Sequence, residues 1–86
     1  MDKTELTLKA IGILVRRQRL QLAISQQRVA DLAGTTSSTY SRFEAGECNS
    51  LTLTMDICKA LNLDFADIIK KASEAHVKYV EAVHVE

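Results

Sequence analysis

The chain has 86 residues, a formal net charge of zero and 47% hydrophobic residues, which fits one small globular domain and excludes a fibrous or disordered chain. No apolar run approaches the roughly 20 residues that a membrane-spanning helix needs, and the polar N-terminus predicts no secretory signal. Two cysteines without a Cys-x-x-Cys motif predict free thiols, a reducing compartment and therefore a cytoplasmic protein.

The first predicted helix lies at the start of the chain and runs to about Leu22. Asp2 or Thr4 can cap its start, and Asp2 with Glu5 has the spacing of a capping box. Apolar residues recur along it at helical spacing and predict the face that packs on the core: Leu6, Ala10, Leu14 and Val15. Leu8 and Ile13 lie off this face, where we expect exposure or contact with a partner.

The stretch 25–46 predicts two short helices joined by a tight turn. Ser25 is a good N-cap for the first of them, because its hydroxyl can accept a hydrogen bond from a free N–H of the first turn. The apolar face of this helix consists of Val29, Leu32 and Ala33. Gly34 follows at once and predicts a helix stop, since glycine adopts a left-handed backbone without a steric clash.

The second of these helices can be capped by Thr35 or Thr36, and Gly46 closes it. Tyr40 and Phe43 point to one side, and the polar residues Ser37, Ser38, Ser41 and Arg42 point elsewhere. A short helix, a glycine turn and a second helix with a polar start make a helix-turn-helix, although a plain helical hairpin has the same pattern. In a helix-turn-helix, the polar start of the second helix enters the major groove of DNA.

Two more helices are predicted in the second half of the chain. Ser50 or Thr52 begins the fourth, Asn62 ends it, and Asp64 caps the fifth. The residues expected to point inward are Leu51, Thr54, Ile57, Cys58 and Leu61 in the fourth helix and Phe65, Ile68 and Ile69 in the fifth.

Charge is distributed unevenly along the chain. The stretch 9–45 has six basic and two acidic residues, a net charge of +4, whereas the stretch 46–86 has a net charge of −3. The basic part coincides with the predicted helix-turn-helix, which favours salt-sensitive binding of double-stranded DNA.

Several motifs between Ile11 and Ile69 resemble the Cro/cI-type helix-turn-helix family, also called the XRE family. They are Ser25-Gln26, Ala30, Ala33-Gly34, the hydroxyl-rich start of the next helix, Phe43-Glu44-Ala45-Gly46 and the stretch from Leu61 to Ile69. The resemblance implies an all-α fold, a compact five-helix lambda-repressor-like domain over residues 1–69. The segment 70–86 then forms a C-terminal extension for dimerisation or partner binding.

The resemblance and the residue types together predict the roles of individual side chains. Gln26 is expected to clamp a phosphate and to contact a base, and Arg42 prefers a guanine edge. The full predicted DNA-binding set is Arg16, Gln26, Arg28, Thr36, Ser37, Ser38, Ser41 and Arg42, with Arg17 as a further phosphate candidate. Arg19 and Glu44 are expected to form a structural ion pair between the first helix and the end of the third.

The predicted function is a sequence-specific DNA-binding transcriptional regulator, a repressor that binds a palindromic operator as a homodimer. The alternative is the antitoxin of a toxin–antitoxin pair, with Leu8, Ile13, Leu53 and the tail serving the toxin. A phage-type repressor and a restriction–modification controller fit the same pattern. No catalytic constellation is present, so we expect neither an enzyme nor a cofactor, and His76 and His84 without a third ligand predict no metal site.

The tail is rich in valine. We favour a strand that pairs with its copy in a second subunit, burying Val77, Tyr79, Val80, Val83 and Val85. Helical spacing also fits a longer dimerising helix, and disorder is the third reading.

Overall fold

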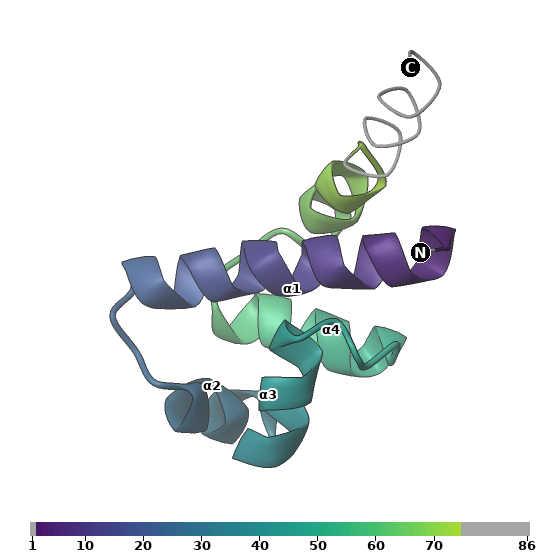
Figure 1. Ribbon diagram of the computed structural model, residues 1–86. Helices are drawn as coiled ribbons and strands as arrows, with labels where there is room; N and C mark the ends of the chain where they lie inside the picture. The colour runs from purple at the N-terminus through teal and green to yellow at the C-terminus, as the bar shows by residue number, and fades with distance from the viewer. Residues whose placement is uncertain (1, 75–86) are drawn as a thin grey trace.

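The computed structural model describes residues 2–74, and these residues form five helices (Figure 1). Their order is α1 (Lys3–Gln21), α2 (Gln26–Ala33), α3 (Ser37–Glu44), α4 (Leu51–Ala60) and a last helix over 65–74. No strand occurs in this part of the chain, which confirms the predicted all-α, five-helix fold. In Figure 1, α2 and α3 lie below the long α1, and the helix over 65–74 lies above it.

Every helix starts at a polar residue whose side chain accepts a hydrogen bond from a backbone N–H three positions later. The five caps are Asp2, Ser25, Thr36, Ser50 and Asp64, with distances of 2.8–3.1 Å. Each bond satisfies an N–H that has no partner inside the helix. Gly34 and Gly46, with φ of 74° and 79°, end α2 and α3 in the left-handed region as predicted.

One apolar core joins all five helices. Its fully buried members include Val15 of α1, Val29 of α2, Tyr40 of α3 and Ile57 of α4, and the last helix adds Ile68 and Ala72. α2 packs against both α3 and α4, while α1 packs against α3. The core thereby fixes α3 from two directions. Cys58 lies in this core, as expected, with 1% of its surface exposed.

Two leucines predicted to point inward are exposed instead. Leu51, the first residue of α4, is 63% exposed. Leu32 is 50% exposed because the buried side of α2 is formed by Val29 and Ala30, and Leu32 lies beside it. Ile69, also expected inside, is half-buried. A periodic apolar stripe predicts the centre of a buried face better than its edges.

The helix over 65–74 runs without a break through residue 70. The predicted boundary between residues 69 and 70 thus falls inside this helix. The division of the chain into 1–69 and 70–86 stays a prediction. The tail residues expected at a dimer interface, Val77, Tyr79, Val80, Val83 and Val85, lie outside the described residues. Within residues 2–74, no helix combines the length and apolar character that crossing a membrane requires.

Candidate nucleic-acid interface

The turn between α2 and α3 has the geometry that its glycine predicts. Gly34 adopts the left-handed conformation, and the N–H of Thr35 donates to the carbonyl oxygen of Ala30 at 2.9 Å. This bond closes the end of α2 and reverses the chain. Thr36 then caps α3 through its hydroxyl, so only a short turn separates the two helices.

The two sides of α3 differ in burial. Tyr40 and Phe43 are 0% and 2% exposed and pack in the core, with their ring centroids 6.4 Å apart. Ser38, Ser41 and Arg42 are exposed on the rest of the helix surface, and Ser37 is half-buried. The Thr36 side chain is exposed but already engaged, because its hydroxyl also donates to the hydroxyl of Thr39 at 3.0 Å. The side of α3 that faces water is therefore polar.

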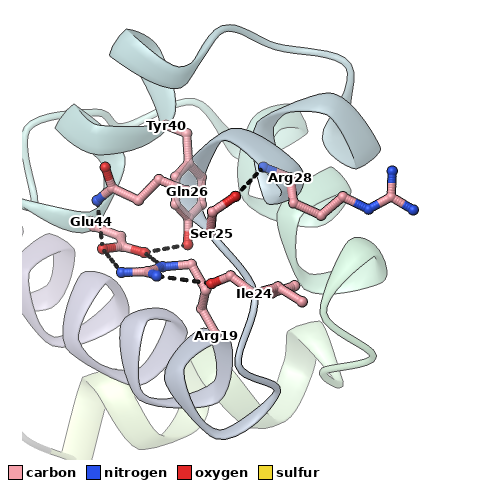
Figure 2. Close-up of polar contacts among 7 residues, drawn as sticks. All are labelled: Arg19, Ile24, Ser25, Gln26, Arg28, Tyr40 and Glu44. Carbon is pink, nitrogen blue, oxygen red and sulfur yellow. Dashed lines mark hydrogen bonds and ion pairs between the residues drawn. The ribbon is translucent and has the colours of Figure 1, made fainter.

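Basic side chains lie on the exposed surface of both α1 and α2. Arg16 and Arg17 of α1 and Arg28 of α2 are exposed. Figure 2 shows the Arg28 side chain extending away from the labelled cluster, while its backbone N–H bonds the cap Ser25. Within residues 2–74, the guanidinium groups of these arginines have no hydrogen-bond or ion-pair partner, so they are available to bind an anion.

Arg19 and Glu44 form an ion pair that links α1 to the end of α3. The Nε and Nη2 atoms of Arg19 donate to Oε2 and Oε1 of Glu44 at 2.6 and 3.3 Å, a side-on bidentate contact. The Nη1 atom of Arg19 also donates to the carbonyl oxygen of Ile24 at 3.0 Å. The two side chains are only 11% and 5% exposed, so water screens the pair weakly.

Two further side chains complete this cluster (Figure 2). The hydroxyl of Tyr40 donates to Oε2 of Glu44 at 2.5 Å, and Nε2 of Gln26 donates to Oε1 of Glu44 at 3.1 Å. The carboxylate therefore accepts four hydrogen bonds, two on each oxygen, which uses its full acceptor capacity. We call Arg19, Gln26, Tyr40 and Glu44 the carboxylate cluster.

The cluster shifts the ionisation of its members. Burial by itself raises the pKa of Glu44, but hydrogen bonds from Arg19, Tyr40 and Gln26 outweigh it and hold the pKa below its ordinary value. The hydrogen bond to Glu44 raises the pKa of Arg19. Burial, followed by the hydrogen bond to Glu44, raises the pKa of Tyr40 well above its ordinary value. At neutral pH the cluster contains a carboxylate, a guanidinium and a neutral phenol.

Sequence reasoning missed several polar contacts, among them those of Tyr40 and Gln18. It placed Tyr40 with Phe43 on one side of the helix and did not connect the Tyr40 hydroxyl to Glu44, although residues four apart are neighbours on a helix surface. It also named no partner for Gln18. The Nε2 atom of Gln18 donates to the carbonyl oxygen of Leu61 at 3.0 Å, and this bond satisfies a carbonyl at the C-terminal end of α4.

The antitoxin alternative requires exposed apolar residues, and a metal site requires clustered ligands. Of the three apolar residues assigned to a toxin, Ile13 is 58% exposed, whereas Leu8 and Leu53 are half-buried. Among residues 2–74, no group of three or more His, Cys, Asp or Glu side chains is placed to hold a metal ion. His76 and His84 lie outside this part of the chain.

A family model described as "Helix-turn-helix domain" matches residues 10–68, and no curated protein sequence gives a significant match. Two crystal structures of the clp gene regulator ClgR from Corynebacterium glutamicum share the fold. The first superposes with a TM-score of 0.78 at 21% identity, over 93% of this chain and 86% of that one. The second gives a TM-score of 0.72 at 24% identity, over 81% and 92%. Since the family model spans more than half of its length, the chain belongs to the helix-turn-helix domain family.

Proposed function

We propose that this protein is a sequence-specific DNA-binding transcription regulator that represses by binding a palindromic operator as a homodimer. The observation that carries the proposal is the division of α3, which turns Tyr40 and Phe43 into the core and an unbroken polar surface toward water. That division suits a helix whose outer side fits into the major groove. The family match and the fold shared with a gene regulator support the same conclusion.

The proposed contacts divide into two kinds. Those with base edges come from α3, at Ser37, Ser38, Ser41 and Arg42, with Thr36 at its start. Short hydroxyl side chains discriminate weakly between bases, so Arg42, which can bond a guanine edge bidentately, supplies most of the direct readout. Gln26, Arg16 and Arg28 bind phosphates and set the orientation of α3 in the groove.

We propose a homodimer because one copy offers only a small surface for contact with DNA. One short recognition helix covers a single half-site, and joining two copies raises affinity without any new type of contact. Two α3 helices related by a two-fold axis would read half-sites about 34 Å apart. We place the subunit contact in the valine-rich tail, because its apolar side chains gain most by leaving water.

Selection of bound duplexes from a random pool tests DNA binding and yields the operator. We expect a palindromic consensus and binding that weakens steeply with salt. Arg42→Ala should weaken binding to that consensus by about 1–3 kcal/mol and relax preference at one base position. The matched control is Lys59→Ala, which removes an exposed positive charge from α4. A pool without enrichment would contradict the proposal, and equal loss on consensus and random DNA would reduce Arg42 to a phosphate contact.

Sedimentation of the full chain and of a chain truncated after Ala75 tests the dimer. The full chain should sediment as a dimer, whereas the truncated chain should stay helical, shift toward monomer and bind the operator more weakly. If both chains give the same dimer, the subunit contact lies on the helices instead of the tail.

A further inference from the structure

Gln26 stands apart from the other proposed phosphate ligands because its side chain is held by the protein. Arg28 projects into solvent, but Gln26 is half-buried and its amide nitrogen bonds Oε1 of Glu44 at 3.1 Å (Figure 2). A carboxylate can only accept hydrogen bonds, so it selects the amide orientation in which nitrogen faces Glu44 and oxygen faces away. The second N–H of the amide has no partner within residues 2–74 and stays available for a phosphate oxygen.

The orientation of Gln26 thus depends on how firmly Glu44 is held. Arg19 contacts both oxygens of the carboxylate and anchors it as a charge. Tyr40 approaches from the core and bonds Oε2 only, which leaves Oε1 to Arg19 and Gln26. The Tyr40 ring is fully buried, so this hydroxyl cannot move without repacking the core. It belongs to the most deeply buried of the residues that donate to the carboxylate.

We infer that Tyr40 is a positioning residue for DNA binding: its hydroxyl fixes the Glu44 carboxylate, which in turn presents the free N–H of Gln26 to a phosphate. This inference rests on the proposed function and adds a buried residue to it. Tyr40 does not touch DNA in this arrangement. Its hydroxyl reduces the conformational entropy that the Gln26 side chain loses on binding, because a side chain that is already ordered loses less freedom.

The test is a pair of double-mutant cycles read out as affinity for a random-sequence duplex at low salt, since phosphate contacts do not depend on sequence. Tyr40→Phe keeps the ring and removes only the hydroxyl. We expect it to weaken binding about threefold, consistent with one modest hydrogen bond. In the Gln26→Ala background, where no amide remains to be positioned, it should change binding by less than about 1.5-fold.

The matched control cycle uses Arg28→Ala, which removes a phosphate ligand that lies outside the carboxylate cluster. Here Tyr40→Phe should still cost about threefold, because the two sites are independent. A merely structural role for Tyr40 would weaken binding equally in all three backgrounds and would overturn the inference. All variants are compared at a temperature at which circular dichroism shows them folded.

A second readout needs no DNA. The side-chain amide protons of Gln26, assigned in NMR spectra by comparison with Gln26→Ala, should differ in chemical shift from those of exposed glutamines in the wild type. In Tyr40→Phe they should move toward the exposed-glutamine shifts. Unchanged signals would overturn the inference while leaving the proposed function intact. If the wild-type chain binds no duplex at all, the proposed function itself is contradicted, so the two failures are distinguishable.

Discussion

Gly12 of α1 and Glu44 at the end of α3 are in backbone contact. A Cβ atom at residue 12 would lie 2.2 Å from the carbonyl oxygen of Glu44 and 3.1 Å from that of Phe43. Real Cβ atoms do not approach backbone oxygen so closely, and a carbonyl cannot rotate away as a flexible side chain can. Glycine is therefore required here by the crossing of two helices, although its backbone is ordinary helix.

We expect Gly12→Ala to destabilise the protein by about 2 kcal/mol or more. Alanine favours a helix by about 1 kcal/mol over glycine, but forcing two packed backbones apart costs more than this gain. Chemical denaturation measures the free energy of unfolding. Ile13→Ala is the control in α1, because Ile13 is 58% exposed and its truncation should change stability little. A Gly12→Ala variant more stable than wild type would show that α1 and α3 can separate freely.

Glu44→Ala should destabilise by about 3–5 kcal/mol, because it leaves the Arg19 guanidinium buried without its partner. Replacing both residues by apolar ones of similar size should recover much of this loss, since no charge then stays buried. The control is Asp67→Ala, which breaks the pair of Asp67 with Lys71, whose side chains are 51% and 55% exposed. That change should alter stability by less than about 1 kcal/mol. Thermal melts that rank the two variants equally would contradict the prediction.

Stability should fall as the pH rises above about 10, the ordinary pKa of tyrosine. Burial, and then the hydrogen bond to Glu44, raises the pKa of Tyr40 in the folded state. Above pH 10 the unfolded chain releases the phenolic proton while the folded chain retains it, so deprotonation favours unfolding. Urea titrations of wild type and Tyr40→Phe between pH 8 and about pH 11 measure this difference. Tyr40→Phe should be less stable than the wild type at pH 8 and should lose less free energy of unfolding as the pH rises. Parallel curves of stability against pH would mean that the pKa of Tyr40 is the same in the folded and unfolded states.

Ala23→Gly should stabilise the protein by about 0.5–1 kcal/mol. Ala23 follows α1 with φ of 57°, a left-handed conformation that costs an alanine about 1–2 kcal/mol. Glycine removes this strain. It also raises the conformational entropy of the unfolded chain, which cancels part of the stabilisation. Ala66→Gly, at an exposed helical position, is the opposite control and should destabilise by about as much. Two variants shifted in the same direction by calorimetry would contradict the assignment of strain.

The parts of this fold that sequence predicts well are those set by local chemistry. Each helix starts at a predicted capping residue. Where the sequence offered two candidates, the structure uses Asp2 rather than Thr4, Thr36 rather than Thr35, and Ser50 rather than Thr52. The glycine stop at Gly34 is equally local. These signals depend on a few neighbouring residues and need no knowledge of the rest of the molecule.

The parts that sequence misses depend on how distant segments meet. Gly12 carries no local sign that a carbonyl lies against it, and Gln18 looks like a polar interruption of an apolar face until α4 supplies the oxygen of Leu61. Gln26 has the same character, since its bond to Glu44 exists only because α2 and α3 are placed together. Such contacts become visible only once the helices are arranged in space.

The alternation of buried and exposed residues along α3 has a consequence for how this protein can change. Tyr40, Phe43 and Glu44 hold the helix in place, and none of them lies on the exposed polar side. Ser38 and Ser41 are exposed and form no side-chain hydrogen bond within residues 2–74, so we expect substitutions there to be nearly neutral for stability. In the proposed DNA complex, mutation at these positions can therefore change the target sequence while the scaffold stays intact. An engineer who randomises them should recover folded proteins with altered DNA preference at high frequency.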